Sequence, residues 1–255
     1  MSAPKAFHLK CSEEEIGRYV FLPGAPERVK QIAENFENYH KVSQNREFTI
    51  YSGFLNNTKV SVVSTGIGGP SAAIAMEELV QCGADTFIRI GTCGGMQPDL
   101  LPGAIIIPTG AVRMEGTSKE YMPIEFPAVP DFALISALSN AAKNSDLKYY
   151  TGVVQCKDSF YGQHSPERMP VKKMLLDNWE AWKAGGVLAS EMESAALFVV
   201  ASTLHVRCAT VLKMIWNQER ENKYGKQPEP DYSTKDVISV AIEAMKNIIN
   251  NDKNQ

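Results

Sequence analysis

The sequence lacks the cysteine pattern and the charge excess that mark several classes of protein. Its five cysteines include no C-x-x-C pair, which argues against a zinc site or a disulfide framework and is typical of a reducing compartment. Lysine and arginine together number 26 against 29 acidic residues, for a net charge of -3. Because a polyanion needs a basic face to bind, this balance gives no reason to expect a nucleic-acid partner.

Long apolar runs are missing too. No uninterrupted apolar stretch approaches the roughly 20 residues that cross a membrane, and the N-terminus has no apolar core of the signal-peptide type. We therefore expect a cytoplasmic protein with no membrane partner. The four histidines are scattered, and none stands at the i, i+4 spacing of a metal-binding pair on a helix.

Short β-type runs alternate with longer helical segments along the chain. The expected strands are 19–22, 58–64, 86–90, 104–108, 150–156 and 208–216; the expected helices are 70–82, 131–144, 193–204 and 234–250, with a further helix opened by Pro26 and a solvated loop over 218–231. No composition break marks a linker. This alternation predicts an α/β fold with one domain over residues 1–255, in which helices flank a central mixed β-sheet.

Three glycine turns follow expected strands: Pro23-Gly24, the run from Thr65 to Ser71, and the run from Gly91 to Gly95. In sheets of this class, ligands bind at the carboxyl ends of the strands, where glycine lets the backbone approach. A dinucleotide site does not fit, because G-x-G-x-x-G would need a glycine where Ser71 stands. A glycine turn by itself is more often only a tight turn.

Two arginines beside these turns favour a bound anion. Arg28 lies one short helical turn beyond Gly24, and Arg89 stands inside the apolar strand 86–90. A buried cation is costly unless an anion meets it. With the Thr92 hydroxyl nearby, the two guanidinium groups suit an oxyanion such as phosphate, because their planar fork donates paired, charge-assisted hydrogen bonds.

A second unusual feature is a pair of carboxylates, Glu191 and Glu193, at the start of the apolar helix 193–204. One of them could serve Arg89 as a buried counter-ion, and for a single arginine that interpretation would be preferred. A negative charge at a helix N-terminus is also worth about 0.3–1 kcal/mol, which explains one glutamate better than two. A carboxylate near an oxyanion site could instead accept both hydrogen bonds of a ribose diol.

Five motifs combine these features: Pro23-Gly24-Ala25-Pro26-Glu27-Arg28, Asn45-Arg46-Glu47-Phe48, residues 64–71, Arg89-Ile90-Gly91-Thr92 and Glu191-Met192-Glu193-Ser194. On these motifs the sequence resembles the uridine phosphorylases, within the wider nucleoside phosphorylase family that also contains purine enzymes. The resemblance covers nearly the whole chain. It implies phosphate-dependent cleavage of the glycosidic bond of uridine, which yields uracil and ribose 1-phosphate, and it implies no organic cofactor beside the co-substrate phosphate.

The resemblance also implies residue roles. It places phosphate at Gly24, Arg28, Arg46, Arg89 and Thr92, ribose at His8, Met192 and Glu193, the base at Phe160, Gln163, Arg168, Glu191, Ile215 and Trp216, and a monovalent cation such as K+ at Glu47, Ile67 and Ser71. Of these, Arg46 and His8 would enter from a neighbouring subunit, so the partners implied are the nucleoside, phosphate and further copies of the chain that share the active site.

The sequence departs from the family pattern at the base site. Four residues separate Gln163 from Arg168 where the pattern has one, and Trp216 is bulkier than usual. Asn217 stands where purine relatives carry an aspartate that protonates the base, and asparagine cannot supply that proton. Three alternatives stay open: a purine nucleoside phosphorylase, a nucleosidase that uses water, and a nucleoside-binding protein without catalysis.

Overall fold

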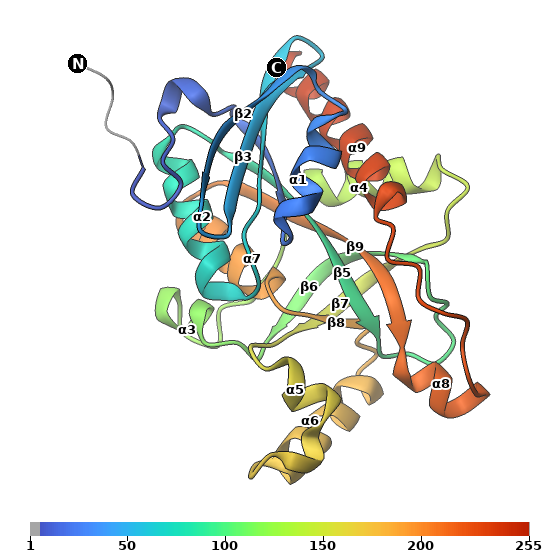
Figure 1. The fold of residues 1–255 in the computed structure, drawn as a ribbon. Coiled ribbons are helices and arrows are strands. Elements are labelled where there is room, and N and C mark those ends of the chain that lie inside the picture. The colour runs from blue at the N-terminus through green and yellow to red at the C-terminus, as the bar shows by residue number, and fades with distance from the viewer. Residues whose placement is uncertain (1–5, 255) are drawn as a thin grey trace.

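One nine-stranded sheet organises residues 6–254, the part of the chain that the computed structural model describes (Figure 1). Its strands are β1 (Tyr19–Pro23), β2 (Glu37–Asn45), β3 (Phe48–Leu55), β4 (Thr58–Val63), β5 (Thr86–Gly95), β6 (Ile105–Arg113), β7 (Tyr149–Cys156), β8 (Ala189–Glu191) and β9 (Arg207–Asn217). Their spatial order is β2-β3-β4-β1-β5-β8-β7-β6-β9. Because β9 also pairs with β5, the strands from β5 onward in this order close into a ring.

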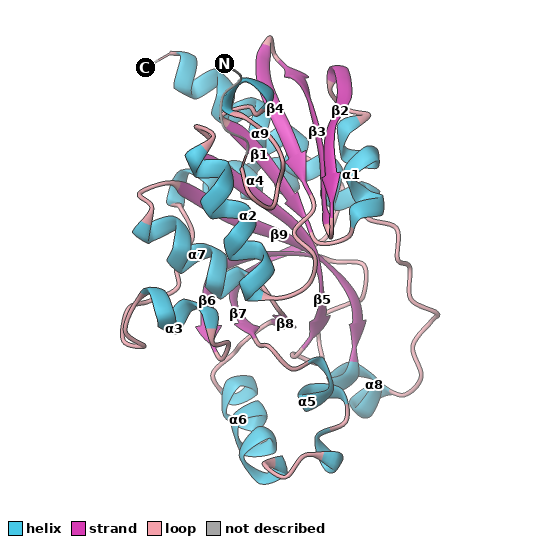
Figure 2. Cartoon of the chain, turned by 60° about the vertical axis from the view of Figure 1, so that its left-hand side comes forward, coloured by secondary structure: helices cyan, strands magenta, loops and turns pink. Residues whose placement is uncertain are grey.

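The helices cover both faces of the sheet (Figure 2). They are α1 (Pro26–Ala33), α2 (Gly69–Gln81), α3 (Thr117–Tyr121), α4 (Phe132–Lys143), α5 (Phe160–His164), α6 (Lys172–Ala184), α7 (Ser194–Thr203), α8 (Gln218–Tyr224) and α9 (Lys235–Lys253), with 3-10 turns at Glu13–Glu15 and Pro166–Arg168. Helices α1, α4 and α9 bury their apolar faces in one core, and α2 and α7 in another. The expected fold class, an α/β domain with a mixed sheet flanked by helices, is confirmed.

Strand β1 shows why the apolar runs in this sequence are continuous. Tyr19 and Phe21 belong to the core beneath α1, α4 and α9, whereas Val20 and Leu22 belong to the core beneath α2 and α7. Successive side chains of a strand point to opposite faces, so a strand covered on both sides must be apolar at every position. No helix within residues 6–254 is long and apolar enough to span a membrane.

The prediction of a turn from Gly91 to Gly95 is wrong. These residues continue β5, which pairs with β9 along its whole length and with β8 at its end. Glycine is needed there for close approach: a Cβ on Gly91 would lie 2.7 Å from Leu212 Cδ2, and one on Gly95 2.6 Å from Asn217 Cγ. The small residues therefore reflect crowded strand pairing, not a change of chain direction.

The expected loop 218–231 is also partly wrong, because α8 occupies its first half. The Asn217 side chain starts this helix by accepting a hydrogen bond from the backbone N–H of Arg220 at 3.1 Å. Strands β2, β3 and β8 and helices α3, α5 and α6 were not predicted. Strand β2 is largely exposed, and α6 has no fully buried residue, so neither has the buried apolar face on which pattern reading depends.

Candidate active site

A cavity of about 880 Å³ opens where β1, β5 and β9 end. These strands are mutually parallel, so their carboxyl ends meet at one edge of the sheet, where α/β folds bind ligands. The predicted residues that line it are Gly24, Arg28, Ile67, Arg89, Thr92, Phe160, Gln163, Glu191, Met192, Glu193, Ile215 and Trp216. The structure thus brings together residues from six separate segments of the sequence.

Arg89 is the buried cation at one end of this cavity, and its side chain is only 5% exposed. Its Nη2 donates to Glu193 Oε2, and its Nε lies 3.5 Å from Glu191 Oε2. Arg89 therefore pairs with both glutamates, as expected if a buried carboxylate is its counter-ion. Within residues 6–254 its Nη1 has no hydrogen-bond acceptor, and its Nε has only the longer ion pair with Glu191, so the guanidinium keeps capacity for a further anion.

Arg28 lines the same end of the cavity as Arg89. Burial lowers the pKa of Arg28, and the positive charge of Arg89 lowers it further. The two cations therefore repel each other, and an anion placed between them would relieve that repulsion. The Arg89 Nη1 also faces Gly24, since it lies 3.9 Å from the position that a Cβ on Gly24 would take.

The two glutamates that precede α7 differ in their roles. Glu191 accepts hydrogen bonds from the backbone N–H groups of Glu193 at 3.0 Å and Ser194 at 2.9 Å. It therefore places a negative charge at the N-terminus of α7, which was the simpler of the two explanations for these glutamates. Glu193 instead accepts from Gly68 N at 2.6 Å and from Arg89. Burial raises the pKa of Glu193, while the charge of Arg89 opposes that rise. Glu193 thus faces the cavity as a buried carboxylate that a cation holds in place.

The other end of the cavity carries Gln163, Phe160 and Trp216. Gln163 belongs to α5, which begins where Ser159 Oγ accepts the Gly162 N–H at 2.9 Å. Its Oε1 accepts a hydrogen bond from Ser190 Oγ at 2.8 Å. An aromatic ring and an indole beside an amide suit a flat, polar-edged ligand such as a nucleobase.

Three predicted residues lie outside the cavity. Arg46 is exposed in the turn between β2 and β3, and the ring Nδ1 of His8 lies 2.6 Å from Glu78 Oε1. Arg168 is exposed, with its guanidinium carbon 5.4 Å from the centre of the Tyr161 ring. The structure brings none of these three side chains to the cavity of its own chain.

The predicted cation residues are only partly assembled. Ser71 Oγ donates to Glu47 Oε1 at 2.6 Å and approaches Thr65 O at 2.5 Å, whereas the Ile67 side chain is 79% exposed. Across residues 6–254, no group of three or more histidine, cysteine or acidic side chains is arranged to hold a metal ion. The monovalent-cation site therefore stays a prediction.

Sequence reasoning missed Lys157, Ser190 and His164, all of which line the cavity. Lys157 is 5% exposed, and its Nζ donates to Ser190 Oγ. A signal for it existed, because Lys157 directly follows the predicted strand 150–156 and thus stands at a strand's carboxyl end, like Gly24 after β1. A cation directly after a strand is a sequence signal of the same kind as Arg89 inside one.

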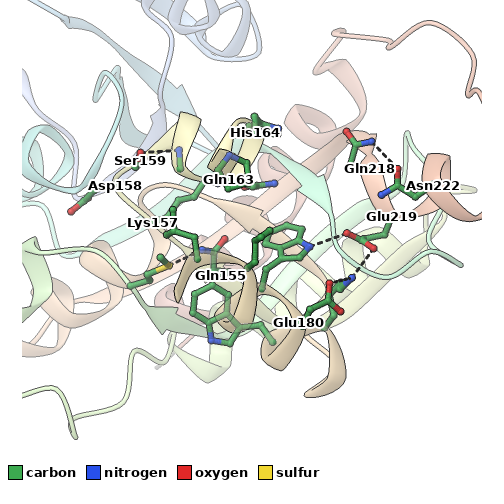
Figure 3. Close-up of a pocket in the computed structure, with 18 residues that line it drawn as sticks. Gln155, Lys157, Asp158, Ser159, Gln163, His164, Glu180, Gln218, Glu219 and Asn222 are labelled. Atoms are coloured by element: carbon green, nitrogen blue, oxygen red, sulfur yellow. Dashed lines mark hydrogen bonds and ion pairs between the residues drawn. The ribbon is translucent and has the colours of Figure 1, made fainter. Parts of the chain in front are cut away.

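A second cavity of about 470 Å³ lies next to the first, between α5, α6 and α8 (Figure 3). Lys157, Gln163 and His164 line both cavities and therefore form the wall between them. On its far side, Trp179 Nε1 donates to Glu219 Oε1 at 2.8 Å. This bond ties α6 to α8 beside the wall that Lys157, Gln163 and His164 form.

The sequence pattern of the phosphorylase superfamily matches residues 18–250. This chain belongs to the phosphorylase superfamily. It is 54% identical to the uridine phosphorylase of Treponema pallidum (strain Nichols) over 246 residues, 96% of this chain and 95% of that protein. It is 39% identical to the uridine phosphorylase of Thermococcus kodakarensis over 242 residues, 94% and 85% of the two chains. The guanosine phosphorylase of Halorubrum lacusprofundi is 35% identical over 244 residues, 95% and 97% of the two chains.

In this phosphorylase superfamily member, Asn217 is a structural residue. Its Nδ2 donates to the carbonyl oxygens of Gln97 and Leu100, both at 2.9 Å, and its Oδ1 caps α8. The side chain is fully buried and does not line the cavity. The end of β9 therefore presents no acid that could protonate a purine ring.

Proposed function

We propose that this phosphorylase superfamily member is a uridine phosphorylase, which transfers the ribosyl group of uridine to inorganic phosphate. The observation that carries the proposal is the pairing of Arg28 with Arg89 at one end of the cavity. Two cations that repel each other in the folded protein suit a doubly charged oxyanion such as phosphate. A hydrolase, whose nucleophile is neutral water, would have little use for them. The names of the relatives from T. pallidum and T. kodakarensis support uridine as the substrate.

In the proposed reaction a phosphate oxygen attacks the anomeric carbon C1′ as the bond from C1′ to N1 of uracil breaks. The new C–O bond gives ribose 1-phosphate, and the electron pair of the broken bond leaves with the base. The proton that phosphate loses on becoming a monoester reaches the uracil anion by way of solvent. The phosphate would be held beneath the sugar by Arg28, Arg89, Thr92 and the backbone at Gly24. The nucleophile is then already oriented for attack, which lowers the entropic part of the barrier.

Glu193 and Met192 are the proposed ribose contacts. A carboxylate can accept hydrogen bonds from both hydroxyls of a cis diol, and Glu193 already has one oxygen anchored by Gly68 N and the other by Arg89. Such anchoring holds the carboxylate in place before substrate arrives. The link to Arg89 also couples the ribose contact directly to the phosphate contact.

Gln163, Phe160, Ile215 and Trp216 are the proposed base contacts. A side-chain amide has both a donor and an acceptor, which suits the alternating carbonyl and N–H groups of the uracil edge. Trp216 and Phe160 would cover the ring faces, and Ile215 would exclude water. Glu191 supports this wall through its cap on α7. The contact from Arg168 to the base stays a prediction that requires this exposed side chain to move.

We further propose that the active site is shared between subunits in the cytoplasm. Arg46 and His8 lie outside their own cavity, so each would complete the phosphate or ribose site of a neighbouring copy. Glu47 and Ser71, which already contact each other, would hold a monovalent cation such as K+ with the backbone at Ile67 near that subunit boundary. The oligomer would be at least a dimer.

Phosphate dependence is the deciding test. Uracil release from uridine is expected to require phosphate or arsenate, and ribose 1-phosphate should form in equal amount when phosphate is present. Product analysis by liquid chromatography with and without phosphate measures both. Equal release in phosphate-free buffer with free ribose as product would establish a nucleosidase, and tight nucleoside binding without turnover would establish a binding protein.

One relative is named a guanosine phosphorylase, so guanosine is the purine nucleoside to test against uridine. Because Asn217 is held by backbone groups outside the cavity, no acid is available there to protonate a purine. We therefore expect uridine to exceed guanosine, inosine and adenosine in kcat/KM. A panel of these four nucleosides with phosphate measures the order, and faster guanosine cleavage would replace uridine in the proposal.

A further inference from the structure

The departure of uracil leaves negative charge on the base, and an enzyme gains most by stabilising charge that develops in the transition state. Three strongly basic side chains line the main cavity: Arg28, Arg89 and Lys157. The two arginines converge at the proposed phosphate end. Arg168, the cation that the family resemblance assigns to the base, is exposed and lies outside the cavity. The base end therefore has one buried cation to offer, Lys157.

Lys157 directly follows the carboxyl end of β7 and lines both cavities; Figure 3 shows it in the wall of the smaller one. Its side chain has little contact with solvent, since the residue is 5% exposed. Within the part of the chain that the structure describes, Ser190 Oγ is the one hydrogen-bond acceptor of its Nζ. An ammonium group has three donors, so two of them stay available toward the cavity that this residue lines.

The charge of Lys157 has support inside the protein. Burial lowers the pKa of Lys157, but the carboxylate of Glu191 acts in the opposite direction and favours the ammonium form. Glu191 is itself engaged by the α7 backbone and by Arg89, and no direct ion pair joins it to Lys157 within residues 6–254. The net direction is a lowered pKa of Lys157, with Glu191 opposing the effect of burial from nearby and no carboxylate in direct contact with Nζ within residues 6–254.

A hydrogen-bond chain extends from Lys157 to Gln163. Ser190 Oγ accepts from Lys157 Nζ, and two amide oxygens lie within reach of its own hydroxyl proton: Gln155 Oε1, which is the nearer, and Gln163 Oε1 at 2.8 Å. Gln163 Nε2 lies on the cavity wall, 3.9 Å from the position that a Cβ on Gly94 would take. Lys157 and Gln163 therefore share Ser190 as a common neighbour at this end of the cavity.

We propose that Lys157 stabilises the negative charge of the departing base, in place of the arginine that the family resemblance would use. The inference rests on the proposed function, because it assigns the cation of that same reaction. As the bond from C1′ to N1 breaks, charge spreads to the carbonyl oxygens of the ring. Lys157 meets this charge with its own, and the Gln163 amide, which shares Ser190 with it, donates to the same edge.

The test compares two leaving groups in a Lys157→Met variant. A fluorine at C5 withdraws electrons, so the anion of 5-fluorouracil needs less help from the protein than that of uracil. Single-turnover cleavage of uridine is expected to slow by about 10²–10³-fold, whereas cleavage of 5-fluorouridine should slow at least several-fold less. Lys157→Arg, which keeps the charge, should restore much of the uridine rate, and Lys173→Met, at an exposed site, is the matched control.

Several outcomes would overturn the inference. Equal slowing of both nucleosides in Lys157→Met would mean that the lysine only shapes the site. A leaving-group-dependent loss in Arg168→Ala but not in Lys157→Met would return the role to the arginine. Should Lys157→Met fail to fold by circular dichroism, Lys157→Gln replaces it, and Ser190→Ala tests the chain to Gln163 with the charge kept. Failure of the wild-type protein to cleave uridine with phosphate would instead reject the proposed function itself.

Discussion

Arg28 and Arg89 lie close together in the cavity, but the protein supports their charges unequally. The pKa of Arg28 is lowered by burial and then by the charge of Arg89, which means that the folded protein opposes its positive charge. Arg89 is compensated by two glutamates, but Arg28 has no ion pair within residues 6–254. Strain of this kind is typical of a site shaped for its ligand.

Replacing Arg28 by alanine should therefore separate stability from activity. We expect the free energy of unfolding without phosphate to change by less than about 0.5 kcal/mol, because a repulsion is lost along with the side chain. The rate of phosphorolysis should fall by about 10²–10³-fold, as when one donor to a developing charge is removed. Thermal melts with and without phosphate, together with initial rates, measure both effects.

The control for this experiment is Lys30→Ala, which removes an exposed cation from the same helix. Phosphate should raise the melting temperature of wild type and of this control alike, since binding to the folded state alone stabilises it. A phosphate-induced shift that survives in Arg28→Ala would show that the anion binds elsewhere.

At the scale of elements, the last helix is fastened to the sheet by one carboxylate. Asp252 near the end of α9 accepts hydrogen bonds from Tyr19 at the start of β1, at 2.8 Å, and from Arg207 at the start of β9. The hydrogen bond from Arg207 holds the pKa of Asp252 below its ordinary value. The helix that covers one face of the sheet is thus held by a charge as well as by its apolar side.

Asp252→Asn should destabilise the protein by about 1.5–3 kcal/mol at pH 7, the usual cost of losing a hydrogen bond to a charged group. A lowered folded-state pKa contributes stability that is present above the unfolded pKa and is lost as pH falls through the folded pKa. The difference in free energy of unfolding between wild type and Asp252→Asn should therefore be constant from pH 8 to 5 and should become smaller only below about pH 4. Urea unfolding at one protein concentration measures it. Asp177→Asn, in an exposed i, i+4 pair, should change little at any pH.

The close pairing of β5 with β9 gives a second prediction at this scale. In Gly95→Ala the new Cβ would meet Asn217 and, at 2.8 Å, Met214 Sδ, so the strands must separate. We expect a loss of about 1–3 kcal/mol, the range for overpacking. Gly110→Ala is the matched control, because its nearest neighbour would be 3.6 Å away in ordinary contact. Equal thermal stability of the two variants would contradict the crowding argument.

At the scale of the whole molecule, the proposal of a shared active site makes its own prediction. Arg89 stands in the cavity, whereas Arg46 is exposed outside it. If Arg46 serves the neighbouring copy, Arg46→Ala and Arg89→Ala subunits are each inactive alone, yet a mixed dimer regains one site with both arginines. Mixing the two variants under conditions that exchange subunits should restore part of the wild-type rate. No recovery, with exchange verified by mass spectrometry, would argue against sharing.

The sequence by itself determined the fold class and much of the candidate site, because local chemistry carries that information. Continuous apolar runs such as 19–22 mark strands covered on both faces, and Arg89 inside an otherwise apolar strand marks a charge that needs an anion. The motifs around Gly24, Arg89 and Glu193 are each complete within a few residues. Their meeting at one cavity follows from parallel strands ending at the same edge.

The tertiary structure decided what depends on contacts between distant segments. Gly91 to Gly95 reads as a turn, and only the neighbouring strand shows why small residues are required there. In the sequence, Lys157 is only a charged residue after a strand. The structure shows that it is buried and donates a hydrogen bond to Ser190, 33 residues away. The position of Arg168 outside the cavity has no signature in the sequence, because the path of a loop depends on the surface against which it packs.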